Sequence, residues 1–137
     1  MRPVYETDLD RKRELQAAQV FADRFQYDIY RLPKFYQMDF AAYQNGQLVR
    51  WIEVKTRTCK STDYNTYMLD FAKFQAGIDI QNASQRLALL VVQWTDTMKY
   101  WAFRPGYLIR PGGRTDRGDP DDVVPCVHIP IHQFIAV

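Results

Sequence analysis

Cysteine is scarce in this chain of 137 residues, which contains only Cys59 and Cys126. Two cysteines are too few for a disulfide framework, so we expect both to be free thiols in a reducing compartment. The sequence also lacks any run of about 18 apolar residues that could span a bilayer, and its first residues lack the apolar stretch of a signal peptide. We therefore expect neither a disulfide-rich secreted domain nor a membrane protein, and we place the chain in a cytoplasm.

A strong excess of charge is missing as well, because the formal net charge is only +2 at pH 7. The charge of the whole molecule is therefore a weak argument for a nucleic-acid partner. Its local distribution says more, since four cations accompany a single acid, Glu53, between residues 50 and 60. Of these cations, Arg57 and Lys60 could contact phosphates, and a solvated strand end would explain the same cluster.

Internal repeats and domain linkers are also absent, and the composition is that of an ordinary globular protein. With 47% hydrophobic and 15% aromatic residues, the chain can bury a core without disulfides. We expect one domain over residues 1–137. Its core should occupy about residues 8–103, followed by a long exposed loop at 104–122 and a C-terminal strand at 123–137.

Hydrophobic spacing and turn signals predict both helices and strands. Thr7 can cap a helix that continues to about Phe25, and a second helix is expected at 66–84. Strands are expected at 28–32, on both sides of the turn signal Asn45-Gly46, at 86–94, at 99–103 and, as an edge strand because of its two prolines, at 123–137. The order predicts an α/β fold, a single domain with a central mixed sheet flanked by helices.

Two charged residues interrupt the apolar strand after Asn45-Gly46, where Glu53 and Lys55 alternate with aliphatic side chains. Side chains two positions apart on a strand point to the same face of the sheet, so this carboxylate and this ammonium lie together. A solvated ion pair would explain them simply and would add little stability. Val49 and Trp51 share their face, however, which favours a covered position over a solvated one.

An acid on the preceding strand completes a motif. Asp39 lies fourteen positions before Glu53, and Lys55 lies two positions after it. This set on a turn-split pair of strands resembles the site of the PD-(D/E)xK, or restriction-endonuclease-like, nuclease superfamily. The chain is similar to phage-type members over roughly residues 9–103. The resemblance implies an α-β-β-β-α-β core and a catalytic site built from these three residues.

The same resemblance implies roles for two helical residues. Glu14 matches the accessory acid that many members place on their first helix, and Lys73 matches a lysine that often sits beside the site. Met38 stands before Asp39 where the family often has proline. Lys73 and its neighbour Gln75 also have a simpler explanation, as solvated side chains of the second helix.

The residue types suit hydrolysis of a phosphodiester bond assisted by Mg²⁺, or by Mn²⁺. Mg²⁺ prefers oxygen ligands, so Asp39 and Glu53 would bind it and the Val54 carbonyl could add a third oxygen. Glu14 could hold a metal-bound water from the helix. Lys55 would orient the attacking water and offset the charge that develops on the phosphate.

The register of the hairpin decides whether the two acids can meet. A two-residue loop at Asn45-Gly46 would place Asp39 opposite Ile52, with its side chain on the wrong face for sharing a metal with Glu53. A three-residue loop over 45–47 would place Asp39 opposite Glu53 instead. We predict the register of such an odd-numbered loop, which also pairs Ala41 with Trp51.

Two further sets of residues could form a zinc site or a DNA clamp, but simpler explanations are favoured for both. Zinc is not expected at Cys59, Cys126, His128 and His132, because Pro130 intervenes and no CxxC pair exists. Four arginines of the segment 104–122 could clamp DNA, namely Arg104, Arg110, Arg114 and Arg117. Nearby aspartates cancel much of their charge, which favours an exposed loop.

Together these features predict a Mg²⁺-dependent deoxyribonuclease whose partner is DNA, as duplex, ends or branched DNA. The predicted site comprises Asp39, Glu53, Lys55 and Glu14, with Lys73, Arg57 and Lys60 as substrate contacts and Val54 as a metal ligand. A Holliday-junction resolvase of the same fold, acting as a homodimer, is an alternative. A non-catalytic module that binds nucleic acid or protein is another. A phage origin, which the resemblance suggests, would place the protein in the host cytoplasm.

Overall fold

A computed structural model describes residues 8–113, 118 and 123–137 of the chain. The helical elements are α1 (Asp8–Phe25), α2 (Phe71–Ser84) and the 3-10 turn η2 (Ile131–Gln133). The strands are β1 (Asp28–Arg31), β2 (Phe40–Gln44), β3 (Gln47–Thr56), β4 (Thr66–Asp70), β5 (Leu87–Gln93), β6 (Met98–Ala102), β7 (Ile109–Gly113), β8 (Val123–Pro130) and β9 (Ile135–Ala136). None of the helices in this part of the chain is long and apolar enough to cross a membrane.

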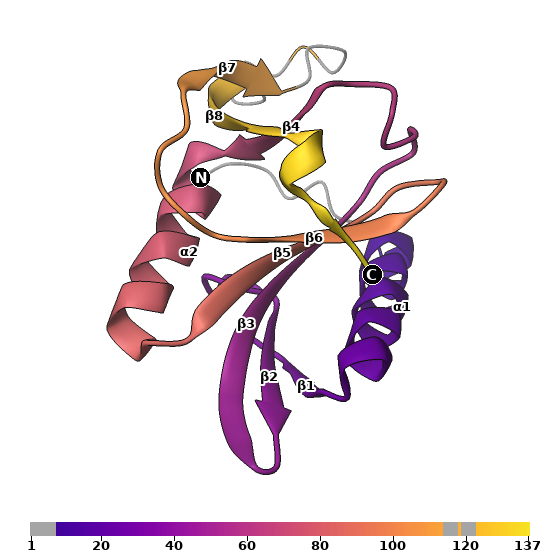
Figure 1. Ribbon diagram of the computed structural model, residues 1–137, viewed down its shortest axis with the longest axis vertical. Coiled ribbons are helices and arrows are strands. Elements are labelled where there is room, and N and C mark those ends of the chain that lie inside the picture. Colours follow the sequence, from indigo (N-terminus) through magenta and orange to yellow (C-terminus); the bar gives the residue numbers. More distant parts are fainter. Residues whose placement is uncertain (1–7, 114–117, 119–122) are drawn as a thin grey trace.

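The elements form three layers (Figure 1). A six-stranded sheet in the order β1-β2-β3-β5-β6-β9 is the middle layer. Helix α1 covers one face, where Ala18 and Phe21 share a hydrophobic cluster with Ile52 and Val54 of β3. Helix α2 and an antiparallel sheet in the order β4-β8-β7 cover the other face. The predicted α/β fold with a central mixed sheet flanked by helices is confirmed.

Strand β5 lies in the middle of the large sheet, parallel to β3 and antiparallel to β6. Its side chains alternate between the two clusters, with Leu89 and Val91 on the α1 side and Leu90 and Val92 on the α2 side. This explains why residues 86–94 are apolar without alternation, since both faces are buried. The strands predicted at 86–94 and 99–103 are confirmed as β5 and β6.

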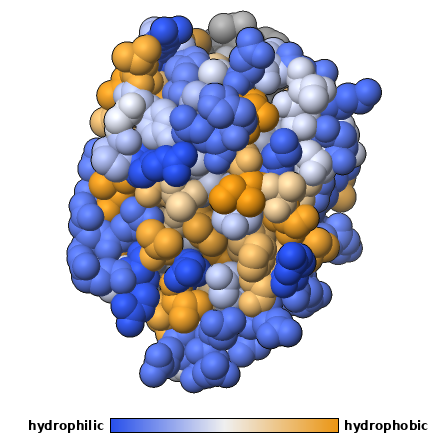
Figure 2. Space-filling model, in the orientation of Figure 1, coloured by the Kyte–Doolittle hydropathy of each residue, from blue (hydrophilic) through white to orange (hydrophobic). Residues whose placement is uncertain are grey.

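The outer surface of this arrangement is mixed in character. In the view of Figure 2, apolar side chains gather near the middle of the face and polar side chains surround them on most sides.

The hairpin of β2 and β3 reaches the predicted register by a different route. Asn45 and Gly46 form the two-residue turn, with φ of +52° and +76°, and Gln44 pairs with Gln47. The predicted odd-numbered loop is therefore wrong. A β-bulge follows, because Tyr43 pairs with Leu48 while Ala42 pairs with Arg50. The bulge adds one residue to β3 and restores the predicted pairing, in which Ala41 lies opposite Trp51.

Residues 66–70 differ from the predicted helix, because they form β4 and the helix begins only at Phe71. Tyr67 and Leu69 are buried while Met68 between them is exposed, which is the period of a strand. Asp70 ends β4 and caps α2, accepting a hydrogen bond on Oδ1 from the Ala72 N–H at 2.8 Å.

The C-terminal part also differs from the sequence prediction. Residues 109–113 of the expected loop form β7, and Arg114 and Arg117 lie outside the described residues. Strand β8 is the middle strand of its sheet rather than an edge strand. Its prolines are tolerated because Pro125 has a partner only on β7 and Pro130 only on β4, so each has one unpaired side.

Candidate active site

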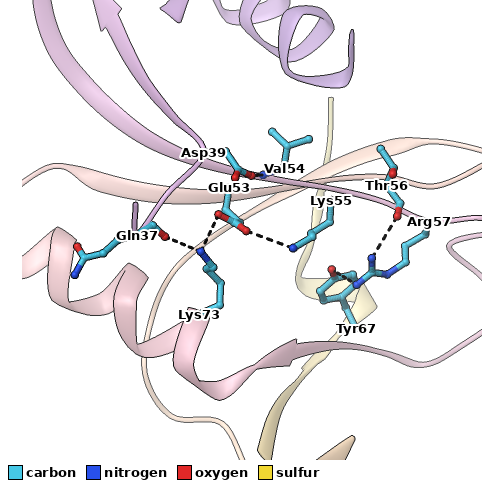
Figure 3. Close-up of polar contacts among 9 residues, drawn as sticks. All are labelled: Gln37, Asp39, Glu53, Val54, Lys55, Thr56, Arg57, Tyr67 and Lys73. Carbon is cyan, nitrogen blue, oxygen red and sulfur yellow. Dashed lines mark hydrogen bonds and ion pairs between the residues drawn. The ribbon is translucent and has the colours of Figure 1, made fainter. Parts of the chain in front are cut away.

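Strand β3 separates its side chains between the two sides of the sheet. Ile52 and Val54 belong to the cluster under α1. Glu53 and Lys55 therefore point toward α2 and the three-stranded sheet, where Lys73 and Tyr67 meet them (Figure 3). The two charged residues singled out by sequence thus face an interior that is covered by other elements.

Glu53 is a buried acid between two lysines. Its side chain is 2% exposed, with Oε2 at 3.5 Å from the Nζ of Lys55 and Oε1 at 3.4 Å from the Nζ of Lys73. The Lys73 contact is longer than an ordinary hydrogen bond, and Oε1 is buried without a hydrogen-bond partner among the described residues. The two ammonium groups compensate the charge of Glu53 in part, and Oε1 can still accept a shorter contact from a donor or a cation.

Burial, and to a smaller extent the negative charge of Asp39, raise the pKa of Glu53 to about 7. The two lysines act in the opposite direction but do not cancel the effect of burial. Glu53 therefore changes charge near neutral pH, which is common for acids at functional sites.

Asp39 lies just before β2 and forms hydrogen bonds with the β3 residues on both sides of Glu53. Its N–H donates to the Ile52 carbonyl at 3.0 Å, and its Oδ2 accepts from the Val54 N–H at 2.8 Å. The N–H and C=O of one strand residue point to the same neighbouring strand, so the Val54 carbonyl also points toward the Asp39 side. The structure thus brings together Asp39, Glu53 and the Val54 carbonyl.

Lys55 lies near the end of β3 with its side chain 36% exposed. Desolvation lowers its pKa, but the negative charge of Glu53, followed by Tyr67, Asp39 and Glu14, outweighs this and leaves the pKa raised. Lys55 is therefore a stable cation beside the acids. Such a cation can hold a water molecule or a phosphate oxygen, and it cannot act as a base in this state.

Glu14 projects from α1, which packs on the opposite face of the large sheet from Glu53. It is half-buried, and its charge contributes to the raised pKa of Lys55. Glu14 is thus within electrostatic reach of the site. In residues 8–113, 118 and 123–137, however, no three His, Cys, Asp or Glu side chains stand together as a metal-binding group.

Lys73 reaches the site from the first turns of α2. Besides the ion pair with Glu53, its Nζ donates to the Gln37 carbonyl at 2.8 Å (Figure 3). Gln75 is not brought to the site, because its amide donates to Asp79 on the exposed side of the same helix.

Arg57 follows β3 and lies over the ring of Tyr67, with 4.7 Å between Cζ and the ring centroid. Its guanidinium also donates to the Tyr67 hydroxyl and to the Thr56 carbonyl. Together with Arg13 of α1 it lines a groove of about 460 Å³. Lys60 lies further along, in an exposed turn where its N–H donates to Asp63 at 2.8 Å.

Sequence reasoning missed two partners of these side chains. Tyr67 was hidden in the predicted helix, although the alternation of Tyr67 and Leu69 could have revealed a strand. The contact of Lys73 with the Gln37 carbonyl joins segments that are distant in the sequence, and no local pattern predicts it.

The oxygen atoms at this site fit a hard divalent cation. Glu53 Oε1 has no hydrogen-bond partner among the described residues, Asp39 lies close enough to raise the pKa of Glu53, and the Val54 carbonyl is directed to the same side. Mg²⁺ commonly takes one or two carboxylates and completes its shell with water and substrate oxygens. Two acids and one carbonyl are sufficient for this type of binding.

The residues considered for zinc are arranged differently. Cys59 and His128 line one cavity, whereas the Sγ of Cys126 donates to the Val124 carbonyl and His132 is exposed. Of the arginines considered for clamping DNA, Arg104 has its contacts away from the site. Arg104 donates to Tyr107 and Gln133, each at 2.9 Å.

Comparison with known proteins gave two findings. The model of a family described as "Phage putative PDDEXK endonuclease" matches residues 1–137. Among solved structures, Hjc from Archaeoglobus fulgidus, a Holliday junction resolvase from an archaeal hyperthermophile, is similar with a TM-score of 0.62 and 12% identity over 92% of this chain and 90% of that chain. At this identity the likeness shows a shared fold. Comparison with curated proteins found no match.

Proposed function

Because the chain belongs to the PDDEXK endonuclease family of phages and is therefore a nuclease, we propose that it hydrolyses phosphodiester bonds of DNA with the help of a divalent cation bound by Asp39 and Glu53. Mg²⁺ is the proposed cation, and Mn²⁺ should replace it. The observation that carries this proposal is the buried Glu53 carboxylate, whose Oε1 has no hydrogen-bond partner among the described residues, beside a second acid.

Asp39, Glu53 and the Val54 carbonyl are the proposed ligands, with Glu14 as an outer acid that holds water. When bound, the cation would neutralise charge on the phosphate and lower the pKa of a water molecule. The hydrogen bond from the Val54 N–H positions Asp39 for this role, because it holds one of the two carboxylate oxygens in place.

The lysines have separate proposed roles. Lys55 is a cation near the open end of β3, so it would bind the phosphate to be cleaved and orient the water that attacks it. Before the divalent cation binds, the positive charge of Lys73 would favour the ionised form of Glu53. Once the divalent cation occupies the position beside Glu53, Lys73 would contact the substrate instead. Arg57 and Lys60 would bind neighbouring phosphates and position the strand.

The proposal is tested by incubation with Mg²⁺ or Mn²⁺ and several forms of DNA, together with Glu53→Gln as the matched control. Cleavage by the wild type that Glu53→Gln loses, while its fold is unchanged, supports the site. Cleavage that survives in Glu53→Gln would belong to another site or to a contaminating enzyme. A parallel incubation with RNA decides whether DNA is the preferred substrate.

A Holliday-junction resolvase is a second candidate, favoured by the fold shared with Hjc over 92% of this chain. A two-fold dimer could present two sites to opposing strands of a junction. Preferential cleavage of four-way junctions over linear duplex, together with a dimeric mass in solution, would support this candidate. As a phage nuclease that acts on DNA, the protein would work in the host cytoplasm in either case.

A further inference from the structure

A cavity of about 320 Å³ lies beside the candidate active site, between the segment that follows β3 and residues of β4 and β8. Arg57 and Tyr67 line it. Both also adjoin Lys55, because Arg57 follows it by two positions and Lys55 and Tyr67 affect the pKa of each other. Two residues of extended chain span roughly 6.6 Å. This distance is within the reach of a single nucleotide, so the cavity is adjacent to the point of cleavage.

Cations line this cavity without a matching acid. Arg57 and Lys60 both contribute to its wall, and none of the described residues that line it is an aspartate or a glutamate. His128 lines it too. An anionic ligand would compensate the two positive charges.

Apolar and aromatic side chains complete the wall. Tyr64 is 68% exposed and Met68 is 44% exposed, and both are among the lining residues together with Ile131. A site for phosphate alone has no need of such a wall. A flat base can stack on a tyrosine ring or lie against a thioether, whatever its sequence.

The cavity wall is held in place before any ligand arrives. The Arg57 guanidinium is stacked on the buried Tyr67 ring and hydrogen-bonded to its hydroxyl. Three backbone contacts fix the segment that follows, namely Arg57 N–H to Gln93 carbonyl at 2.8 Å, Thr95 N–H to Cys59 carbonyl at 3.1 Å and Ser61 N–H to Asp96 Oδ1 at 2.8 Å. A preformed site loses little entropy on binding.

We propose that this cavity binds one unpaired nucleotide of the strand being cut, with its phosphate at Arg57 and Lys60 and its base against Tyr64 and Met68. A volume of about 320 Å³ is in the range of small-molecule sites and too small for a base pair. The base must therefore leave the duplex or be unpaired already. The inference rests on the proposed function, whose substrate it narrows to DNA with an unpaired nucleotide next to the cleaved bond.

Binding is tested first, without metal and without cleavage. Isotope-labelled protein in EDTA is titrated with thymidine 5′-monophosphate, thymidine and inorganic phosphate while the amide signals of residues 57–68 are followed. The monophosphate should bind most tightly, and Tyr64→Ala should weaken it by about fivefold or more, since stacking of a base contributes this much. Lys60→Ala should weaken it similarly. Equal binding of all three probes, or shifts confined to other surfaces, would overturn the inference.

Matched control variants are available on the other side of the molecule. Tyr30 of β1 is 61% exposed, and Lys12 of α1 is exposed, and neither lines the cavity. Tyr30→Ala and Lys12→Ala should leave nucleotide binding unchanged. If they weaken it as much as Tyr64→Ala and Lys60→Ala do, the binding is not at this cavity and the inference is wrong.

Cleavage is tested next, with the same variants and two DNA substrates that differ by one unpaired nucleotide next to the cut. Tyr64→Ala should slow cleavage of the unpaired substrate more than that of the paired one, and an equal effect on both would contradict the inference. Glu53→Gln separates this outcome from the proposed function. It should lose cleavage and keep nucleotide binding, so activity remaining in Glu53→Gln would reject the catalytic proposal alone.

Discussion

The carboxylate of Asp39 accepts a hydrogen bond from the N–H of Val54, with 2.8 Å between the oxygen and the nitrogen. This contact ties the start of β2 to the strand that carries Glu53, at the point where the ladder between the two strands ends. One acid is thus positioned by the backbone on which the other acid stands.

Asp39 should have separable structural and chemical roles. Asp39→Asn keeps an oxygen that can accept from the Val54 N–H, so its stability should stay close to that of the wild type while cleavage is lost with the charge. Asp39→Ala also loses the acceptor, and it should be less stable by about 1–3 kcal/mol. Denaturant unfolding and a cleavage assay check the pair. Equal stability of both variants would contradict the role given to this hydrogen bond.

The stability of the metal-free protein should fall as pH rises through the range in which Glu53 titrates. Its pKa is about 7 in the folded protein against an ordinary 4.5, so between these values the folded state holds a proton that the unfolded state has released. The free energy of unfolding then decreases from about pH 4.5 to pH 7 by roughly 3 kcal/mol and levels off above. Glu53→Gln, measured by unfolding over the same pH range in EDTA, should lack this decrease. A wild-type curve that runs parallel to the Glu53→Gln curve would show that Glu53 has no raised pKa.

Lys73 should act on that titration through its charge. Its ammonium lies 3.4 Å from Glu53 Oε1 and lowers the pKa of the acid. Lys73→Met should therefore raise the pKa of Glu53, so the fall in stability still begins near pH 4.5 but extends to higher pH. Lys12→Met, on an exposed position of α1, is the matched control and should leave the curve in place. A curve unchanged in Lys73→Met would remove Lys73 from the site.

Lys55 should be needed for the chemical step rather than for folding. Its side chain is 36% exposed, so Lys55→Met should cost little stability, whereas cleavage should slow by on the order of a hundredfold or more. Lys55→Arg keeps the charge but not the compact ammonium, and it should recover only part of the rate. Single-turnover cleavage at saturating DNA separates the chemical step from binding. A wild-type rate in Lys55→Met would exclude this lysine from catalysis.

The sequence predicts the face shared by Glu53 and Lys55, because strand alternation is a local property. It also predicts the pairing of Ala41 with Trp51, although with the wrong loop. The residue types around Val49 give no signal for the β-bulge that produces this pairing. Strand β4 is missed for a related reason. Its pattern in residues 66–70 is short, and it continues directly into the helical pattern of α2.

What lies beyond sequence reasoning depends on contacts between distant segments. The burial of Glu53 requires α2 and β4 to cover the same face of β3, and its raised pKa follows from that burial. The contact between Lys73 and the Gln37 carbonyl and the stacking of Arg57 on Tyr67 likewise join separate elements. The residue types alone can suggest that Glu53, Lys73 and Arg57 belong to a functional site. The residues that each of them contacts are known only from the three-dimensional structure.

The proposed function depends most on the binding of a divalent cation between Asp39 and Glu53. Crystals soaked in Mn²⁺ and measured near the manganese absorption edge test this directly, because the anomalous signal locates the ion independently of any activity. We predict a single strong peak within bonding distance of a carboxylate oxygen from each of the two acids, and no peak there in Glu53→Gln. A peak elsewhere on the molecule, or none in the wild type at millimolar Mn²⁺, would contradict the proposed site.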